Sequence, residues 1–531
     1  MSTGHERYPL IEKATSTMKH IVICCDGTGN EYGDANSNVV KLYRALARDA
    51  GQLATYYHPG VGTMGAKNAL SEAGKVWTQF RGLAFGYGLS ENIADAYRYL
   101  MQTFEPDDRI FIFGFSRGAY TARALCGMLE MFGLLAPGVE GQIPYAMRLF
   151  KRRDGGILSG LRARSSKFAI ARGFKSTFCR ECKPHFLGLW DTVSSVGWIL
   201  DPIGLKPGGL PYTFSLGDVS IVRHALAIDE RRAFFRQNMA QDRSARDIKQ
   251  VWFAGVHSDV GGSYPEAESG LSKISLSWMF REAQQAGLLF DASTVARTLG
   301  GDLAHAKPLP NAVMHNSLTP LWWLAEFWPK FTKRRVSQPG VEPERFKGHP
   351  RLNLFRRRHI PDGARIHESV LTRKAMLPRY APSNLPQEFT REPDPDTAPY
   401  PTRLKPGDTA RVGVFARAKW NNTTIEVRKG ETYRFEATGT WYDASIPSGP
   451  SGYMSPSFGF RLVERLRRRP HDNWFALIGA VGQDRSAAFL VGAASETTIF
   501  NDGVLYCYAN DLPFLYGNNS GTLKLQVTRL A

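Results

Sequence analysis

Residues 107–123 read DDRIFIFGFSRGAYTAR, and this stretch decides the fold. Its first half contains a run of apolar residues typical of a buried parallel strand, and its second half favours a helix. Ser116 lies at the turn between them, two residues after Gly114 and two before Gly118. In a nucleophile elbow, glycines at these positions allow a strained turn that exposes the serine hydroxyl. We therefore predict a strand, a sharp turn and a helix, with Ser116 as a nucleophile rather than a structural turn residue.

The length and charge of the chain limit its class. Its 531 residues predict two or three domains, and its formal net charge of +18 indicates an anionic partner, either a phospholipid surface or nucleic acid. A soluble basic enzyme would carry the same charge. The basic blocks match no nucleic-acid recognition motif, so we expect no nucleic acid as partner.

Targeting and redox signals are few. The sequence has no apolar run of transmembrane length, and its first twenty residues lack the apolar stretch of a secretory signal. We therefore expect synthesis in the cytoplasm without a signal peptide. The six cysteines form no evident disulfide framework, and the C-x-x-C of Cys179 and Cys182 has no second pair nearby to complete a zinc site.

Several apolar strands alternate with helical segments around the elbow. Residues 20–25 form the first of them and lead directly into Asp26, Gly27 and Thr28. This alternation predicts an α/β protein with an α/β-hydrolase-like, doubly wound and mostly parallel sheet. Backbone N–H groups of Gly27 and Thr28, with that of Arg117 after the serine, could form an oxyanion hole. The alternative is a tight turn in which Asp26 caps the next element.

Two further strand ends carry the residue types that a serine nucleophile requires. Asp191 follows the apolar residues 185–190, and His257 follows the apolar residues 249–254. The order serine, aspartate, histidine is the one used by α/β-hydrolases. The imidazole would take the serine proton and return it to the leaving group, while the carboxylate would orient the imidazole and stabilise its charged form. We favour Asp191 over Asp229 and Asp259 as this carboxylate.

We expect the catalytic domain to span residues 18–377, after an N-terminal tail of residues 1–17. It contains two basic insertions, at about 134–182 and about 301–377. The first predicts a cap that suits an anionic lipid surface, although a solvated basic loop is equally compatible. The second contains four large aromatic side chains within seven residues, followed by clusters of Lys and Arg. Aromatic rings beside cations suit membrane docking, but they could also be core residues. The aromatic residues are Trp322, Trp323, Phe327 and Trp328, and the later arginines are Arg356, Arg357 and Arg358.

A change of pattern marks the last part of the chain. Residues 378–407 are rich in proline and predict an extended linker, and residues 408–531 show short alternating strands that predict a β-sandwich. Within it, residues 510–521 read NDLPFLYGNNSG. The carboxylate, the two adjacent amides and the carbonyls of this loop are the hard oxygen ligands that Ca²⁺ takes, although an Asn-rich loop can also be only a turn.

Five ordered motifs give the first half of the chain a specific resemblance, over about residues 18–300. They are Asp26-Gly27-Thr28-x-Asn30, Gly60-Val61-Gly62-Thr63, Gly-Phe-Ser116-Arg-Gly-Ala-Tyr, Trp190-Asp191-Thr192-Val193 and His257-Ser-Asp259-Val-Gly-Gly. Together they resemble the α/β-hydrolase family that includes type VI secretion phospholipase effectors. The resemblance implies a catalytic triad of Ser116, Asp191 and His257 that acts on the acyl esters of phospholipids. It also implies secretion by a type VI system, action at a membrane surface, and a secretion-system component or an immunity protein as partner.

The C-terminal part resembles the bacterial calcium-dependent galactophilic lectin over about 120 residues. The resemblance is carried by residues 510–521, by residues 429–441 and by residues 475–479. It implies that Ca²⁺ is bound by the side chains of Asp511, Asn518 and Asn519, with backbone carbonyls of Leu515 and near Asp443. Leu515 replaces a residue whose side chain would help to hold sugar, and the loop at residues 445–470 differs. Calcium is therefore the better supported of the two ligands.

The sequence thus predicts a serine esterase, a phospholipase of the A type, with a targeting β-sandwich. One alternative is an esterase of acylated glycans, to which a carbohydrate-binding module would deliver it. Another is a non-catalytic hydrolase fold that presents a carbohydrate- or membrane-binding module. No nucleotide or redox cofactor is expected.

Overall fold

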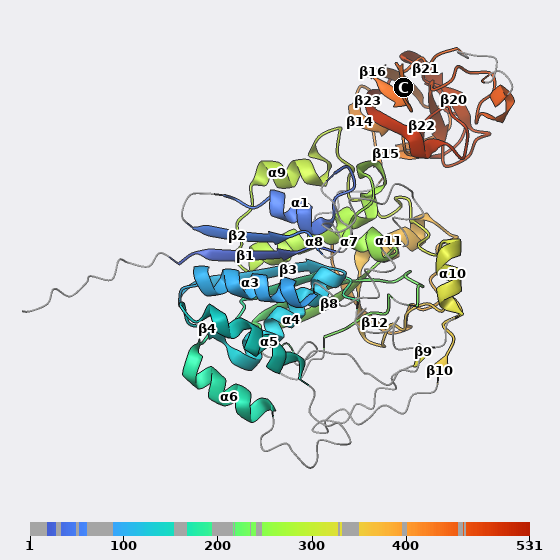
Figure 1. The fold of residues 1–531 in the computed structure, drawn as a ribbon. Helices are drawn as coiled ribbons and strands as arrows, with labels where there is room; N and C mark the ends of the chain where they lie inside the picture. Colours follow the sequence, from blue (N-terminus) through green and yellow to red (C-terminus); the bar gives the residue numbers. More distant parts are fainter. Residues whose placement is uncertain are drawn as a thin grey trace, which may run out of the picture.

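The computed structural model describes two units, an α/β unit followed by a β-sandwich (Figure 1). The described residues are 18–27, 33–48, 52–60, 89–152, 167–193, 216, 218–233, 235–240, 247–327, 330–331, 350–395, 401–454, 460 and 463–531.

An eight-stranded sheet forms the centre of the α/β unit. Its strand order is β12-β11-β8-β7-β6-β3-β1-β2, and every neighbouring pair is parallel. This is the α/β class with a parallel sheet that the strand and helix alternation predicts. The strands are β1 (His20–Cys25), β2 (Leu53–His58), β3 (Arg109–Phe115), β6 (Phe186–Trp190), β7 (Ile221–Ala227), β8 (Asp247–Phe253), β11 (Ala364–His367) and β12 (Phe389–Glu392).

Helices cover both faces of this sheet (Figure 1). Successive side chains of a strand point to opposite faces, so each apolar strand contributes to two cores. Ile21 and Ile23 of β1 pack in one core with α3 and α4, while Val22 and Cys24 pack in the other with α1 and α8. The helices of this unit are α1 (Asn38–Arg44), α3 (Leu89–Thr103), α4 (Arg117–Phe132), α5 (Ile143–Lys151), α6 (Lys167–Phe178), α7 (His257–Gly261), α8 (Gly270–Gln285), α9 (Ala292–Ala296), α10 (Pro320–Glu326) and α11 (Glu368–Met376). Among the described helices, none combines the length and apolarity needed to cross a bilayer.

The described part of the first basic insertion lies in the helical layer of the sheet. α5 and α6 contribute Phe150 and Phe174 to the same core as α3 and α4. The insertion begins and ends in a short hairpin of β4 (Leu134–Leu135) and β5 (Cys179–Arg180), directly after the C-terminus of α4. Because α4 starts at the elbow and runs for 16 residues, or about 24 Å, this hairpin lies far from Ser116. The expected cap is therefore not formed by these described helices. Residues 153–166 lie outside the described part.

The α/β sheet extends further along the chain than residue 377. Strand β12 falls within residues 378–407, which the proline content predicts as linker, and it pairs with β11 as the sheet edge. Proline is compatible with an edge position, and β12 itself contains none. At the other end of the same segment, β13 (Thr402–Arg403) already pairs with β15 of the sandwich. Residues 389–392 and 402–403 thus belong to the two sheets rather than to an extended linker, and residues 396–400 lie outside the described part.

The C-terminal unit is a β-sandwich around one core. One sheet has the order β13-β15-β22-β19-β20, and the other has the order β18-β17-β23-β16-β21, with β14 paired to β23. Tyr433, Trp441 and Phe475 lie fully buried between them. The remaining strands are β14 (Thr409–Phe415), β15 (Asn421–Val427), β16 (Thr432–Thr438), β17 (Trp441–Asp443), β18 (Ile446–Ser448), β19 (Leu477–Val481), β20 (Ala488–Leu490), β21 (Ala494–Thr498), β22 (Gly503–Ala509) and β23 (Asn519–Arg529).

Polar contacts join the two units. Asn311 Nδ2 donates to the Tyr506 hydroxyl at 3.1 Å, and Asn422 Nδ2 donates to Asn311 Oδ1 at 2.7 Å. Arg417 Nε lies 3.4 Å from Glu268 Oε1. The sandwich therefore contacts the α/β unit at Glu268, just before α8, and at Asn311, before α10. Figure 1 shows the sandwich at one end of the α/β unit.

Candidate active site

The strand order places a topological switch point between β1 and β3. From β1, the chain leaves through α1 on one face and reaches β2, whereas α3 and α4 lie on the opposite face. In an open α/β sheet, this reversal lies between two central strands, and ligands bind beyond their carboxyl ends. Asp26 follows β1 and Ser116 follows β3, so both lie at this switch point.

The turn at Ser116 has the geometry of a nucleophile elbow. Ser116 has a φ of 58° and a ψ of −118°, a strained conformation for a residue with a side chain. A Cβ atom on Gly118 would lie 2.1 Å from the carbonyl oxygen of Cys25, and one on Gly114 would lie 2.6 Å from the carbonyl oxygen of Gly118. Only glycine fits either position, which explains the spacing around the serine.

The structure brings Ser116, His257 and Asp191 together. His257 Nε2 lies 2.8 Å from Ser116 Oγ, and His257 Nδ1 lies 2.5 Å from Asp191 Oδ2. Asp191 follows β6 and His257 begins α7 just after β8, so the three side chains come from carboxyl ends of strands in one sheet. The hydrogen-bond chain has the order that general-base activation of a serine requires.

Asp191 is fully buried, and both of its oxygens are occupied. Oδ1 accepts from the Ala227 backbone N–H at 3.0 Å and from Arg358 Nη1 at 2.5 Å, while Oδ2 accepts from Arg358 Nη2 at 2.9 Å. Burial alone would raise the pKa of this carboxyl, but Arg358 and His257 hold it below its usual range. Arg358 could not be identified from the sequence, because it belongs to a run of three arginines that were interpreted as surface cations.

The two alternative carboxylates serve other elements. Asp229 accepts from the Gly255 N–H, from Arg357 and from the Tyr380 hydroxyl, at 2.8 to 2.9 Å. Asp259 accepts from the Val256 N–H at 3.0 Å and binds His315 Nδ1 at 2.6 Å. The carboxylate on the His257 ring is therefore Asp191.

Further side chains surround His257 that the sequence pattern did not reveal. Glu230 Oε2 accepts from the His257 backbone N–H at 3.2 Å and pairs with Arg232 at 2.9 Å. Burial alone would raise the pKa of Glu230, but Arg232 lowers it to about 2. The Phe235 ring lies edge-on to the imidazole, with centroids 4.9 Å apart. Burial lowers the pKa of His257, and the hydrogen bond to Asp191 opposes that shift.

The expected oxyanion hole is only partly described. The Gly27 N–H donates to Asp26 Oδ1 at 2.6 Å, and the same carboxylate accepts from Ser37 and Tyr57. Asp26 thus organises the turn, which agrees with the alternative interpretation of this loop. Thr28 lies outside the described residues. Arg117 is the first residue of α4, directly after Ser116, where a helix presents N–H groups to an anion.

The aromatic segment of the second insertion forms α10 beside this site. Trp322 packs edge-on against Phe235, with centroids 5.4 Å apart, whereas Trp323 and Phe327 are 51% and 57% exposed. The ring of Phe355 lies edge-on to the rings of Trp323 and Phe327, and the preceding residue, Leu354, is exposed. We call Trp323, Phe327 and Leu354 the apolar rim. Trp328 lies outside the described residues.

The arginines that follow this segment do not all face solvent. Arg357 pairs with Asp229 at 2.8 Å, and Arg358 is buried against Asp191. Arg356, the first of the three consecutive arginines, is exposed. The interpretation of the whole run as membrane-facing cations is therefore wrong for Arg358, whose guanidinium is buried in an ion pair with Asp191.

The predicted metal ligands converge in the sandwich. Asn518 Nδ2 donates to Asp443 Oδ1 at 3.2 Å, and Asn519 Nδ2 donates to Asp511 Oδ2 at 2.9 Å. Burial raises the pKa of Asp511, and the charge of Asp443 raises it further. Asn519 Oδ1 is buried and has no hydrogen-bond partner among the described residues. Leu515 lies in the same loop, 43% exposed. Among the described residues, no group of three or more His, Cys, Asp or Glu side chains is placed to hold a metal.

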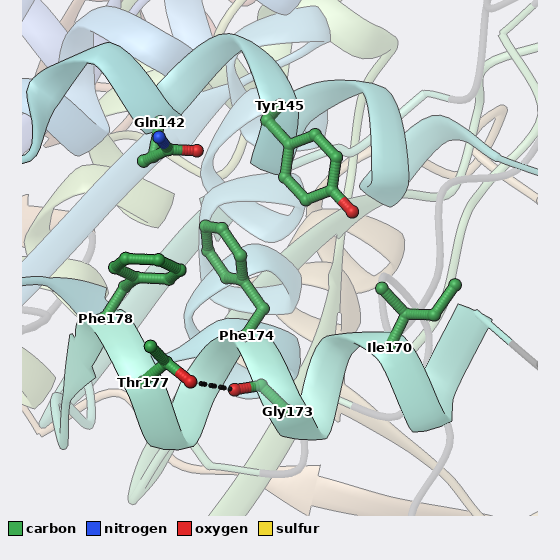
Figure 2. A pocket seen from close by; sticks show the side chains of 7 residues that line it. All are labelled: Gln142, Tyr145, Ile170, Gly173, Phe174, Thr177 and Phe178. Carbon is green, nitrogen blue, oxygen red and sulfur yellow. Dashed lines mark hydrogen bonds between the residues drawn. The ribbon is translucent and has the colours of Figure 1, made fainter.

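A separate pocket of about 350 Å³ lies between α5 and α6 (Figure 2). Tyr145 and Phe174 face one another across it, with ring centroids 5.5 Å apart. All seven lining residues come from these two helices and their flanks, and none comes from a strand end that carries Ser116, Asp191 or His257. This pocket is therefore distinct from the candidate active site.

Comparisons with known proteins identify a family for the first half of the chain. The family model for the catalytic domain of Tle1-like phospholipase effectors of type VI secretion systems matches residues 19–282. An uncharacterized protein of Saccharomyces cerevisiae is 36% identical over 243 residues, which are 44% of this chain and 34% of that protein. The chain thus spans about a third of the length of this curated relative.

Solved structures with similarity to the chain include two for its first half and one for its sandwich. A structure of the Tle1 effector bound to the VgrG spike is 19% identical, with a TM-score of 0.29, over 51% of this chain and 57% of that one. An uncharacterized protein from Pseudomonas aeruginosa is 20% identical, with a TM-score of 0.29, over 52% and 47%. The N-terminal domain of EclA, a PllA-like lectin, is 19% identical, with a TM-score of 0.18, over 22% and 94%.

Proposed function

Because residues 19–282 belong to the family of Tle1-like catalytic domains of type VI secretion phospholipase effectors, we propose that this protein is a serine hydrolase that releases fatty acids from phospholipids. The observation that carries the proposal is the hydrogen-bond chain from Ser116 through His257 to Asp191. Each member has the chemistry of its proposed role, and all three lie at the carboxyl edge of one sheet.

The reaction follows from this arrangement. Ser116 Oγ attacks the ester carbonyl while His257 Nε2 accepts its proton, and Asp191 stabilises the imidazolium that forms. The Arg117 N–H, at the start of α4, stabilises the oxyanion. His257 then donates the proton to the leaving alcohol, which departs as a lysophospholipid. Water activated by the same imidazole hydrolyses the acyl-serine and releases the fatty acid.

We further propose that the apolar rim contacts the lipid surface. Its exposed Trp323 and Phe327 lie within and directly after α10, the helix whose Trp322 packs on Phe235 beside His257. Apolar rings at the mouth of a site allow an enzyme to rest on the headgroup region of a bilayer. The net charge of +18 favours an anionic membrane. By family membership, we propose delivery by a type VI secretion system, with a component of that system as partner.

The sandwich is proposed to bind Ca²⁺. The donor set fits this ion, since Asp443, Asp511 and Asn518 bring oxygen ligands to one loop cluster. A cation would give the buried Asn519 Oδ1 a partner, and it would reduce the repulsion between the carboxylates of Asp443 and Asp511. When bound, Ca²⁺ would supply charge neutralisation and hold the loop.

Fatty-acid release from vesicles of phosphatidylethanolamine and phosphatidylglycerol tests the proposed function. We expect release by the wild type and a loss of at least about a thousandfold in Ser116→Ala. Ser176→Ala, at an exposed serine of α6, should retain full activity. The double variant Trp323→Ser/Phe327→Ser should lose activity on vesicles but retain it on a short, dispersed ester.

The substrate class is tested in parallel with an acylated glycan. Cleavage of the glycan but not of the lipid would overturn the phospholipid proposal in favour of a glycan esterase. Cleavage of neither ester by folded protein would overturn the assignment as a hydrolase.

A further inference from the structure

Arg358 holds the triad carboxylate in a two-pronged ion pair that no step of the proposed reaction uses. Its Nη1 and Nη2 donate to Asp191 Oδ1 and Oδ2 at 2.5 and 2.9 Å. Its remaining hydrogen bonds go to the backbone carbonyls of Phe235 and Ala227. The side chain is 4% exposed, so this contact is made away from water. A planar guanidinium bound at both ends of a carboxylate fixes the plane of that carboxylate.

The arginine also brings a positive charge close to the imidazole. In the described part of the chain, the charged groups near His257 or its partner Asp191 are Glu230, Arg232 and Arg358. His224 is also buried close to Asp191, and burial lowers its pKa so that its neutral form is favoured. Asp191 and Glu230 stabilise an imidazolium, whereas Arg232 and Arg358 oppose it. The pair of acids is therefore balanced by a pair of cations. A general base must be neutral before the reaction, so this balance sets the pH at which His257 can act.

We propose that Arg358 is a positioning residue of the hydrolase: it fixes the orientation of Asp191 and offsets part of its charge, so that His257 stays neutral and able to accept the Ser116 proton at lower pH. This inference rests on the proposed triad but not on the identity of the ester.

Arg358 reaches the triad from a distant part of the chain, and its neighbour Arg357 does not. Arg358 lies 167 positions after Asp191, on the segment that returns from α10 toward β11. Arg357, its neighbour, pairs instead with Asp229 at 2.8 Å and is a third exposed. The two adjacent arginines thus offer a matched pair, because only one of them touches the triad.

The test is the rate at which a fluorophosphonate labels Ser116, measured from pH 5 to pH 9. This probe reports on the serine and its base without a lipid substrate. The variants are Arg358→Met, which removes the charge, Arg358→Lys, which keeps the charge but not the fork, and Arg357→Met as the control. Near-ultraviolet circular dichroism of each variant verifies that it is folded.

The expected results separate charge from orientation. In Arg358→Met, the charge of Asp191 is no longer offset, so the pKa of His257 rises and the acid limb of the profile moves up by about one pH unit. In Arg358→Lys, the limb stays near that of the wild type and the plateau falls about tenfold, because a single ammonium does not fix both oxygens. Arg357→Met should match the wild type.

Three outcomes would overturn the inference. They are an unmoved acid limb in folded Arg358→Met, an equal shift in Arg357→Met, and a wild-type plateau in Arg358→Lys. If Arg358→Met does not fold, Arg358→Lys decides alone by its plateau. Labelling that follows the expected profiles, in a protein that releases no fatty acid, would contradict the proposed substrate and leave the role of Arg358 standing.

Discussion

Gly118 marks the point where the elbow touches the neighbouring strand. Its α-carbon faces the end of β1, and an added Cβ would lie 2.1 Å from the Cys25 carbonyl oxygen. We expect Gly118→Ala to displace the start of α4 and to destabilise the protein by about 2 kcal/mol or more. Labelling of Ser116 by a fluorophosphonate should fall with it.

Gly173→Ala is the matched control for this prediction. Gly173 lies inside α6 with nothing within 4 Å of an added Cβ, so the change should be neutral or stabilise by about 0.5–1 kcal/mol. Urea unfolding of both variants provides the measurement. A Gly118→Ala protein as stable and as reactive as the wild type would contradict the packing argument.

Among single residues, the sequence predicts those that lie directly after a strand of the sheet. Ser116, Asp191 and His257 each follow an apolar strand, and the carboxyl ends of parallel strands share one edge. Arg358 could not be predicted in this way. It follows no strand, and only its burial distinguishes it from the neighbouring Arg356 and Arg357.

Among the elements, the short helix α7 depends on a network at its first turn. Asp259 accepts from the Val256 N–H and binds His315, whose other ring nitrogen lies 2.9 Å from Glu268. Burial alone would lower the pKa of His315, but the two carboxylates raise it to about 9. Since α7 begins with His257, this network also holds the proposed base in place.

The network predicts a pH-dependent part of the stability. A raised pKa in the folded state contributes stability that is fully present below the ordinary histidine pKa of about 6.5 and is lost as pH rises through about 9. The contribution is at most of the order of 3 kcal/mol. We expect the difference in unfolding free energy between wild type and His315→Gln to shrink across this window.

Denaturant titrations at pH 6, 7.5 and 9 would measure this difference, with His471→Gln as a control at an exposed histidine. A difference that is constant with pH would refute the assignment of a charged His315.

The element boundaries were less predictable than the element types. The proline-rich segment contains β12, because a short polar strand can complete a sheet edge without an apolar pattern of its own. The first insertion is basic in sequence, yet its helices α5 and α6 pack against the core through Phe150 and Phe174. The charged residues of α5 and α6 indicate only their exposed faces, so the basic composition did not predict that the opposite faces pack in the core.

For the whole molecule, the sandwich and the α/β unit meet at Glu268, where Arg417 approaches the same network that supports α7. The proposed Ca²⁺ cluster of Asp443, Asp511 and Asn518 lies within the sandwich itself. An ion that binds only the folded sandwich stabilises it by mass action.

We therefore expect Ca²⁺ to raise the unfolding temperature of the sandwich in the full chain by several degrees relative to a chelator. Mg²⁺, which demands shorter and more regular coordination, should act less. Asp511→Asn should lose the effect. Differential scanning calorimetry gives the measurement, and identical thermograms in Ca²⁺ and in chelator would contradict the proposed site.

The most direct measurement of the central claim is the mass of the protein after reaction with a fluorophosphonate, followed by mapping of the modified peptide. We predict a single adduct on Ser116, and we predict that His257→Ala and Asp191→Ala lose at least about a hundredfold in labelling rate. A folded wild-type protein that carries no adduct, or carries it on another serine, would contradict the assignment of Ser116, His257 and Asp191 as the catalytic triad.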